Sequence, residues 1–565
     1  MARLSHSVTN VWVLRPAPTA RKGRYFWLIN HPGCKAFSTC RRFLFASPTP
    51  NGNTLPNVPP LALIERLIAC ALLLVALFPV FRLACTPNFR LKLRAFPGAS
   101  RALTLALLGA VAGILALTLF LPNLLRPVAV ATALLLIAMW WRARPSHGRA
   151  RGLPPGSLAL LPVGQWTNRD YYEKQAARFG PIFKASHVLK PTICVVGMDN
   201  AAALFREHAD AVQPDPIPSS RFVQRGFLRY MSDPDHAAYR ALFREAFSRE
   251  VVEQCLPQMT DLALAGILRL ANAAPTNDAN PQTLGDHIHQ IVFEIITAVF
   301  HGVSPDSPEF AILESTCRVA DVNRAAQTPA AAVREALDRA FATIRTLGET
   351  IRRDDAAGKI PQPSFLSQLL DAKPDALDDP AILGNLVFIP MTASLDTAGM
   401  LTWAIKLLSL NPRWIERLRT PDPQSPGEPL ARRVIRETLR MEQSEYLVRI
   451  LSRDVRFRGH LLPKGWLLRI CTRESHRNSA DFVNPDTFDP DRFLTRAHRA
   501  ASYAPFGLGA RACLGEQLTL AIGSIFLTEM AANLDWTISS DGPDEYNGFH
   551  WCPSRRFRLK FAKRP

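Results

Sequence analysis

The chain has 565 residues, of which 48% are hydrophobic and 20% charged, and its formal net charge is +19 at pH 7. A net charge of this size favours an acidic partner such as a nucleic acid or a membrane surface. Residues 1–169 hold 20 Lys and Arg and a single acid, which leaves 47 bases and 47 acids in residues 170–565. The larger part is therefore neutral, which excludes a nucleic-acid footprint there and indicates a basic, membrane-associated N-terminus.

The N-terminal part divides into a basic extension and an apolar region. Residues 1–58 hold eight Lys and Arg, several prolines and no acid, which is typical of a disordered or targeting extension. Residues 59–151 contain three apolar runs. The run at residues 102–121 carries no charge over 20 positions and is long enough to cross a bilayer. Shorter runs lie at residues 67–81 and 127–141, so we predict two to three apolar helices.

Charges beside the apolar runs indicate the topology. Basic clusters at residues 82–101 and 142–151 flank residues 102–141, which can form a helical hairpin. Both clusters then face the cytoplasm, as the positive-inside rule requires. Residues 152–156, Gly-Leu-Pro-Pro-Gly, predict a stiff hinge before a single large domain at residues 152–565.

A cationic helix is the first element of interest in that domain. Residues 231–247 predict a helix on which His236 and Arg240 lie at positions i and i+4. One face therefore presents two cationic donors. The same spacing is ordinary for a surface pair, which stays the alternative.

A long apolar stretch at residues 381–410 contains an acid beside an alcohol, Asp396 and Thr397. Such a pair is costly to bury unless both groups are hydrogen-bonded, so it indicates either a proton relay or a local structural role. In the structural alternative, the threonine bonds back to a helix carbonyl and the acid faces water. Pro390 lies just before the pair and predicts a kink in this helix.

Three further motifs lie between this apolar stretch and residue 493. The segment ETLR places Glu437 and Arg440 one turn apart on a helix face, which is also a common arrangement for exposed ion pairs. Residues 446–453 alternate like a strand and carry Arg449. The later segment FDPDRF contains Arg492.

A glycine-rich loop at residues 506–515, FGLGARACLG, surrounds Cys513. This cysteine has no His or second Cys at the spacing of a zinc site, but a single thiolate can be the axial ligand of a haem iron. Glycines let the loop lie against a flat macrocycle, the arginine can pair with a haem propionate, and the phenylalanine shields the sulfur. The loop residues expected at this site, besides the cysteine, are Phe506, Gly509, Arg511 and Gly515. A buried free cysteine in a turn is the alternative.

Together, these motifs resemble those of the cytochrome P450 superfamily over residues 152–565. The resemblance implies a mainly α fold with a small β region, here preceded by the predicted N-terminal transmembrane helices. It implies haem b with an axial thiolate from Cys513.

The same resemblance implies a role for each motif. The resemblance implies that the haem propionates are bound by His236, Arg240, Arg449 and Arg511. It also implies that a buried structural network is formed by Glu437, Arg440 and Arg492. Thr397 would steady dioxygen and Asp396 would couple it to solvent. Two departures from the family pattern are Ser394, where a glycine is usual, and residues 441–446, MEQSEY, where an apolar-His-Pro sequence is common.

The resulting prediction is a haem-thiolate monooxygenase that inserts one oxygen atom of O2 into an apolar small molecule. No Gly-rich dinucleotide fingerprint or flavin module is evident in the sequence, so electrons come from a separate ferredoxin or flavoprotein reductase. The other expected partner is the lipid bilayer, not nucleic acid, with the catalytic domain on the cytoplasmic side of the membrane. Two alternatives are a haem-thiolate isomerase or peroxygenase without external electrons, which the retained Asp396–Thr397 pair disfavours, and a non-catalytic membrane haem sensor.

Overall fold

The computed structural model describes residues 152–564 with short gaps, and before them only Ala131 and Leu134, which are helical. The gaps lie at residues 159–162, 188–189, 215–221, 223–225, 273–282, 321–327, 360–361, 421–426, 444–446, 495–497, 499–501 and 547–549. Apart from those two residues, the predictions for the basic extension and the apolar runs lie outside the described residues.

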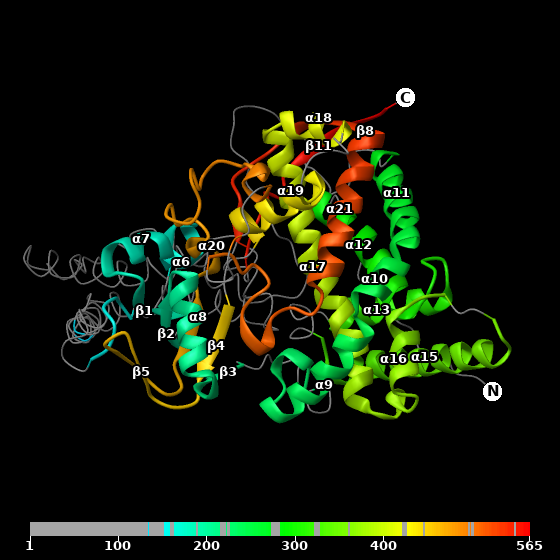
Figure 1. Ribbon diagram of the computed structural model, residues 1–565, viewed down its shortest axis with the longest axis horizontal. Coiled ribbons are helices and arrows are strands. Elements are labelled where there is room, and N and C mark those ends of the chain that lie inside the picture. Colours follow the sequence, from blue (N-terminus) through cyan, green and yellow to red (C-terminus); the bar gives the residue numbers. More distant parts are fainter. Residues whose placement is uncertain are drawn as a thin grey trace, which may run out of the picture. The chain divides into compact units, whose positions relative to one another are not determined.

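Helices make up most of the described chain, as predicted (Figure 1). The α-helices are α6 (Val163–Thr167), α7 (Tyr171–Phe179), α8 (Met198–Glu207), α9 (Asp233–Ala246), α10 (Arg249–Gln254), α11 (Leu256–Asn272), α12 (Leu284–His301), α13 (Pro308–Ala320), α15 (Ala330–Ala356), α16 (Phe365–Ala372), α17 (Pro380–Leu410), α18 (Arg413–Arg419), α19 (Leu430–Thr438), α20 (Thr472–Ser475) and α21 (Glu516–Asn533). Short 3-10 helices are η1 (Ala209–Ala211), η3 (Leu228–Tyr230), η4 (Ala376–Asp378), η6 (Pro490–Phe493) and η7 (Gly509–Arg511), and η5 (Leu439–Gln443) is a π-helix.

The small β region forms one larger sheet and three strand pairs. The strands are β1 (Ile182–His187), β2 (Lys190–Val195), β3 (Val212–Gln213), β4 (Leu447–Leu451), β5 (Val455–Phe457), β6 (His460–Leu462), β7 (Leu467–Ile470), β8 (Leu534–Ser540), β9 (Glu545–Tyr546), β10 (Trp551–Cys552) and β11 (Arg558–Lys563). The larger sheet has the order β1-β2-β7-β4-β3, in which β2 and β7 are parallel and the other neighbours antiparallel. The predicted strand with Arg449 is confirmed as β4, which lies between β7 and β3 in this sheet.

The central helix is α17, and it confirms the helix predicted at residues 381–410. Its first half packs in a hydrophobic cluster with α9, α13, α15 and α16, and its second half in another with α11, α12, α19 and α21. Figure 1 shows α17 beside α12 and α21. A helix that is apolar on all sides is buried on all sides, which explains this position.

Pro390 lies inside α17, and the helix continues through it. Proline has no N–H, so the carbonyl of Leu386, four residues earlier, loses its usual helical partner. His301, at the end of α12, donates from Nε2 to this carbonyl at 3.1 Å. A neighbouring helix therefore satisfies the group that the proline leaves unbonded.

The predicted hinge at residues 152–156 is fastened to the sheet. Lys184 of β1 donates from Nζ to the carbonyl of Pro154 at 2.9 Å and from its backbone N–H to Pro155 at 2.8 Å. Gly156 has a φ of +124°, and a Cβ at this position would lie 2.2 Å from the carbonyl oxygen of Lys184. Only glycine allows this close approach.

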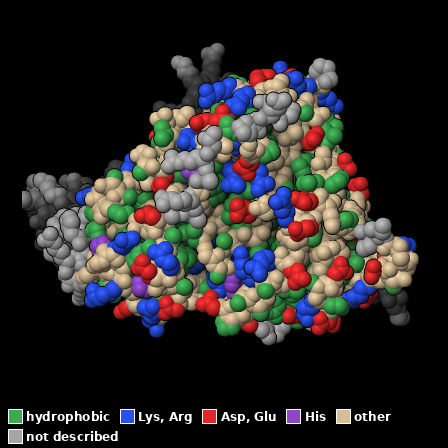
Figure 2. Space-filling model, viewed as in Figure 1, with side chains coloured by type: hydrophobic (Ala, Val, Ile, Leu, Met, Phe, Trp, Pro, Cys, Tyr) green, Lys and Arg blue, Asp and Glu red, His purple; other side chains and the backbone are tan. Residues whose placement is uncertain are grey.

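Within the described residues, α17 alone is long and apolar enough to cross a membrane, and 72% of its apolar window is buried in the protein. It is the core helix of the domain. Figure 2 shows Lys and Arg side chains interspersed with Asp and Glu over the face in view. This mixed surface agrees with the equal number of bases and acids in residues 170–565.

Candidate active site

The loop at residues 506–515 turns tightly around Cys513. The Cys513 backbone N–H donates to the carbonyl of Phe506 at 2.8 Å, which closes the loop. Gly507 and Gly509 have φ values of +86° and +71°, in the left-handed region that other residues rarely adopt. The Phe506 ring packs against the core cluster of α17 and α21.

The Cys513 thiol borders an internal space. Its side chain is exposed, yet burial by the surrounding protein raises its pKa. The thiol is thus accessible although protein atoms surround it on most sides, as in a recess. The Gly515 N–H donates to the sulfur, and this bond and the charge of Arg229 lower the pKa of Cys513.

Asp396 of α17 faces the same space. It is exposed although most of α17 is buried, and burial raises its pKa, which the charges of His550 and Arg229 oppose. Asp396 in turn raises the pKa of Cys513, so the two groups are within range of each other's charge. Thr397, the next residue, is 2% exposed and buried against the core.

A cluster of cations lies beside this space, and Arg449 is its most buried member. Arg449 is 2% exposed; its Nη1 donates to the carbonyl of Val448 at 2.8 Å, whereas Nε and Nη2 have no partner among the described atoms. Burial, and then the charges of Arg229 and Arg511, lower the pKa of Arg449 to about 10. A buried guanidinium with two unbonded nitrogens lacks an anion.

His236 and Arg240 of α9 belong to the same cluster. His236 is 4% exposed, and burial followed by the charges of Arg511 and Arg240 lowers its pKa to about 4. Burial also lowers the pKa of Arg240, whereas the charge of Cys513 raises it. The structure thus brings both predicted donors of α9 close to the cysteine loop and Arg449, with Arg240 as a cation and His236 as a neutral imidazole at pH 7.

Arg511 has other partners. It donates to the carbonyls of Arg229 and Met231 at 2.9 and 2.7 Å and to Oδ1 of Asp233 at 2.8 Å. These bonds tie the cysteine loop to the segment that leads into α9. The sequence predicted Arg511 as a propionate partner, and in the structure its Nη1 and Nη2 donate to this segment.

These residues fit a haem. A porphyrin iron accepts one thiolate, and the two propionates of the macrocycle supply the anions that the cation cluster lacks. Cys513 supplies the thiol and Arg449 the buried guanidinium that meet these two needs. Among the described residues, no group of three or more His, Cys, Asp or Glu could hold a different metal ion.

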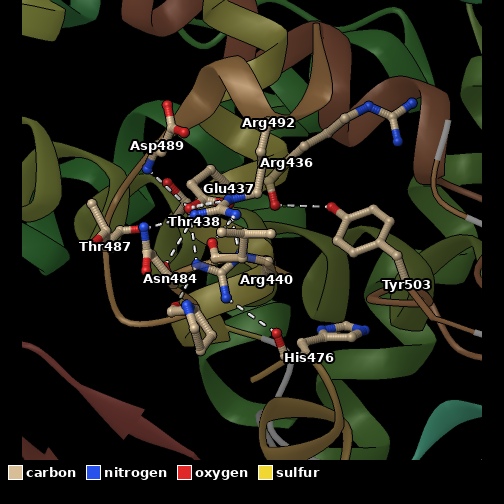
Figure 3. Close-up of polar contacts among 12 residues, drawn as sticks. Arg436, Glu437, Thr438, Arg440, His476, Asn484, Thr487, Asp489, Arg492 and Tyr503 are labelled. Atoms are coloured by element: carbon tan, nitrogen blue, oxygen red, sulfur yellow. Dashed lines mark hydrogen bonds and ion pairs between the residues drawn. The ribbon is translucent and has the colours of Figure 1, made fainter. Parts of the chain in front are cut away.

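Glu437 is the centre of a buried network (Figure 3). Arg440 donates from Nε and Nη2 to its two oxygens at 2.8 and 2.9 Å, and Arg492 donates from Nε to Oε1 at 2.9 Å. The backbone N–H of Asp489 donates to the same oxygen at 3.0 Å. The structure therefore brings together all three predicted members and fixes the segment before the cysteine loop to α19.

The network reaches the cysteine loop through His476. Arg440 donates from Nη1 to the His476 carbonyl at 3.1 Å, and the His476 ring accepts at Nε2 from the Ala504 N–H at 3.0 Å. The Ala504 carbonyl then accepts from the Gly507 N–H at 3.1 Å. A continuous series of hydrogen bonds thus joins the buried ion pairs to the turn that holds Cys513.

Two departures from the family pattern have partners in the structure. Ser394 donates to the carbonyl of Met391, and its hydroxyl lies 3.2 Å from Nε2 of His289 on α12, which links the two helices. Glu442, in the MEQSEY segment, is buried in an ion pair with Arg169.

Sequence reasoning missed Arg229, His476 and His550. None of the three falls within a recognisable spacing, because each reaches the site through tertiary packing from a loop or a helix end. The nearest sequence signal is the run of turn residues around His476, which indicates a loop but no function.

Comparisons with known proteins agree with this geometry. The family model described as Cytochrome P450 matches residues 154–561. Abscisic acid 8'-hydroxylase 4 of Arabidopsis thaliana is 24% identical over 436 residues, which cover 72% of this chain and 91% of the relative. Abscisic acid 8'-hydroxylase 1 of Oryza sativa subsp. japonica is 24% identical over 472 residues, covering 77% and 97%.

A solved structure shares the fold. The retinoic acid bound cyanobacterial CYP120A1 superposes with a TM-score of 0.59 at 21% sequence identity, over 73% of this chain and 99% of that chain. The family model covers well over half of the chain, and its members use haem with a cysteine thiolate as axial ligand. The chain therefore belongs to the cytochrome P450 family and is a haem-dependent monooxygenase.

Proposed function

We propose that this chain is a membrane-anchored haem-thiolate monooxygenase that inserts one oxygen atom of O2 into an apolar organic substrate. The single observation that carries the proposal is the glycine turn that holds the exposed thiol of Cys513, which Arg511 ties to the start of α9 near the buried, partly unbonded guanidinium of Arg449. When bound, the haem supplies the oxygen-activating chemistry. The residues of the chain bind and orient the cofactor, exclude water and deliver protons.

Cofactor binding is assigned to two groups of residues. Cys513 would ligate the haem iron, and the Gly515 N–H would stabilise its thiolate. Arg449 and the α9 pair, His236 and Arg240, receive the propionates. Arg511 orders the cysteine loop against α9 and adds positive charge, while Phe506 and Gly509 shape the turn.

Proton delivery is assigned to Asp396 and Thr397. Asp396 is exposed to the internal space and its pKa is raised by burial, so it can carry a proton at a higher pH than a surface acid. Thr397 lies next to it on α17, and its hydroxyl would hold a proton between Asp396 and the cofactor, which would supply the oxygen chemistry. The network of Glu437, Arg440 and Arg492 has a structural role, since it fixes the approach to the cysteine loop.

The substrate is proposed to be apolar because an apolar pocket lies beside the first half of α17. Its lining includes Phe227, Phe388, Met391 and Leu337. The names of the relatives and of the similar structure concern abscisic acid and retinoic acid, and these two compounds are therefore the first probes.

The proposed organisation has three parts: a basic extension at residues 1–58, a membrane region with two to three apolar helices at residues 59–151, and the catalytic domain at residues 152–565. The uncharged run at residues 102–121 supports the membrane part. The catalytic domain lies on the cytoplasmic side, and a ferredoxin or flavoprotein reductase delivers the electrons.

The reduced carbon monoxide complex tests the haem-thiolate assignment. The full chain should give the red-shifted Soret band of thiolate ligation, and Cys513→Ala should lose it. Cys317→Ala, which removes a half-buried cysteine on α13, is the matched control and should keep it. An unchanged spectrum for Cys513→Ala would exclude this cysteine as the ligand.

Extraction of membranes tests the anchoring. The full chain should stay in the pellet after high salt and after alkaline carbonate, because spanning helices are held by burial in the bilayer. Release by high salt alone would contradict the spanning helices and favour a peripheral basic arm.

A further inference from the structure

The hairpin of β5 and β6 presents positive charge to solvent. Residues 453–464, here called the basic hairpin, hold four Lys and Arg and a single acid. Val455 and Phe457 are buried against the core. Arg456 and Arg458, which alternate with them along the chain, are exposed. Because successive side chains of a strand point to opposite faces, the hairpin has an apolar inner face and a cationic outer face.

Most of the cations of the basic hairpin have no acidic partner. Arg453 is neutralised, since its Nε lies 2.8 Å from Oδ2 of Asp210. Arg456, Arg458 and Lys464 are also exposed, and no acid in the described part of the chain forms an ion pair with them. Three positive charges on one small element are therefore left for a partner outside the domain.

The tip of the basic hairpin carries one of these three charges. Arg458 and Gly459 form the turn between the strands, with φ values of +48° and +78°. Positive φ at both central positions is usual in a two-residue hairpin turn and favours Asn or Gly at the first of them. The shape of the turn therefore does not account for an arginine at its most exposed point.

The described chain enters the domain directly beside the basic hairpin. The Gly152 carbonyl accepts from the backbone N–H of Leu461 on β6 at 2.7 Å. A Cβ on Gly152 would lie 3.8 Å from Nη1 of Arg456, so this guanidinium lies against the point of entry. Lys184 of β1 then donates from Nζ to the carbonyl of Pro154 at 2.9 Å. The entry and the hairpin are thus held together by hydrogen bonds.

The sequence before Gly152 is also cationic. Residues 142–151 hold four arginines and no acid, and they follow the apolar run at residues 127–141. An extended chain rises about 3.3 Å per residue, so the entry at Gly152 lies within roughly 36 Å of the end of that run. The chain therefore restricts the basic hairpin to the neighbourhood of the proposed membrane region.

We propose that the basic hairpin binds the anionic headgroups of a lipid bilayer beside the point where the chain leaves it. An anionic bilayer attracts Lys and Arg that come within a Debye length of its surface, about 8–10 Å at physiological salt. Lipid phosphate and carboxylate groups then supply the anions that Arg456, Arg458 and Lys464 lack. This inference rests on the proposed membrane anchoring and extends it by naming the surface of the domain that lies on the bilayer.

A nucleic acid would offer the same phosphate chemistry. Residues 170–565 hold 47 bases and 47 acids, so the domain as a whole has no excess of positive charge. The unpartnered cations of the basic hairpin lie beside the entry of the chain, next to the segment that follows the apolar runs. This position favours a lipid surface as the partner.

Acetylation of lysines in lipid nanodiscs tests the contact. The full chain is placed in discs of phosphatidylcholine alone or mixed with phosphatidylserine, and an N-hydroxysuccinimide ester of acetic acid labels the amines that water can reach. Mass spectrometry gives the rate at each lysine. The rate at Lys464 should fall roughly fivefold in anionic discs relative to detergent, and less in neutral discs. High salt should restore it, because it screens the attraction.

Lys359 is the matched control. Its side chain is exposed, and it follows α15, which Figure 1 shows on the opposite side of the view from β5. Lys359 should be labelled at the same rate in detergent and in both kinds of disc. A uniform change at both lysines would report the reagent and not a contact.

A charge reversal tests the arginines of the basic hairpin. The double variant Arg456→Glu and Arg458→Glu should lose the protection of Lys464 in anionic discs, because repulsion replaces attraction. The reduced carbon monoxide spectrum confirms that the variant keeps its haem and its fold. Arg334→Glu with Arg345→Glu, at exposed positions of α15, makes the same change of charge and should keep the protection.

The outcomes separate this inference from the proposed anchoring. Labelling of Lys464 at the detergent rate, in a chain that stays in anionic discs, would overturn the inference and leave the anchoring intact. Loss of the chain from both kinds of disc would overturn the anchoring itself. Equal protection in neutral and anionic discs would contradict a role for the hairpin charges. Protection of Lys464 by RNA but not by anionic discs would make the hairpin a nucleic-acid surface.

Discussion

Arg440 donates from Nε and Nη2 to the two carboxylate oxygens of Glu437, at 2.8 and 2.9 Å, and both side chains are fully buried. The third guanidinium nitrogen of Arg440, Nη1, donates a hydrogen bond to the carbonyl of His476. The pair therefore does more than neutralise two charges. Through Arg440 it also positions His476, whose ring accepts a hydrogen bond from the Ala504 N–H just before the cysteine loop. Buried ion pairs of this kind fix a conformation more reliably than they add net stability.

We expect Glu437→Gln to destabilise the domain by about 3–5 kcal/mol, because it leaves the buried guanidinium of Arg440 without a counter-charge. Urea unfolding and haem retention should both report the loss. Glu428→Gln is the matched control: Glu428 also pairs with two arginines, Arg432 and Arg436, but at a partly exposed position. There the cost should stay below about 1 kcal/mol. Equal losses in the two variants would contradict a special role for the buried pair.

Arg449→Met should have opposite effects on the haem-free and haem-loaded protein. Without haem, the variant should be at least as stable as the wild type, because it removes a buried charge with two unbonded nitrogens. With haem, it loses a charge-assisted hydrogen bond to a propionate, and haem should dissociate roughly tenfold faster. Haem transfer to an acceptor protein measures this rate. Arg453→Met, which removes an exposed partner of Asp210, should change neither quantity.

Thr397→Ala should uncouple electron consumption from oxygen insertion. The variant lacks the hydroxyl that would hold a proton beside the cofactor, so the peroxide formed per electron pair should rise about tenfold. Thr402→Ala on the same helix is the control, because the Thr402 hydroxyl bonds back to the carbonyl of Ala398 at 2.7 Å. Peroxide yields that match in the two variants would make Thr397 a structural residue.

The sequence predicted those parts of the fold that have a local pattern. The apolar run at residues 381–410 is confirmed as α17. A helix that is apolar on all sides is stable only when it is buried in the core, which is where α17 lies. Alternation at residues 446–453 is confirmed as β4. The sheet order β1-β2-β7-β4-β3 was beyond prediction, since pairing of β2 with β7 joins segments some 270 residues apart that share no local signal.

The candidate site also contains residues that a local sequence pattern predicts and residues that no such pattern predicts. Cys513, Asp396 and Glu437 lie in motifs of fixed spacing, so the sequence could single them out. Arg229 reaches the site from η3 and His550 from the position before β10, and only the packing of these two segments brings them near Asp396. The hydrogen bonds from Arg511 to the carbonyls of residues 229 and 231 could not be predicted either, because every residue has a backbone carbonyl and the sequence does not mark which one accepts.

The partner of the proline in α17 gives a further prediction. His301→Phe should cost about 1–3 kcal/mol, because it leaves the buried Leu386 carbonyl without a donor. In a Pro390→Ala background the restored N–H at position 390 can bond this carbonyl, and the cost of His301→Phe should fall below about 1 kcal/mol. Urea unfolding of the two single variants and the double variant measures the difference. Additive losses would mean that the histidine packs without serving the carbonyl.

His476 makes the stability of the domain sensitive to acid. Its Nε2 accepts from the Ala504 N–H, so the ring must be unprotonated there, and burial followed by the charges of Arg440 and His498 lowers its pKa to about 3. In the unfolded chain a histidine has a pKa of about 6.5. Between these values the unfolded state binds a proton that the folded state excludes, so the stability is complete above pH 6.5 and is lost as the pH falls toward 3.

We therefore expect His476→Gln to flatten this part of the pH dependence. Glutamine can accept the Ala504 N–H without titrating, so the variant should lose about 2 kcal/mol less than the wild type between pH 6.5 and pH 5. Urea unfolding at the two pH values measures the free energy of unfolding in each protein. His208→Gln, at a half-buried position outside the network, is the control and should keep the wild-type slope. If His476→Gln kept that slope as well, the acid sensitivity would arise from other groups, and the imidazole would titrate in the folded protein much as it does in the unfolded chain.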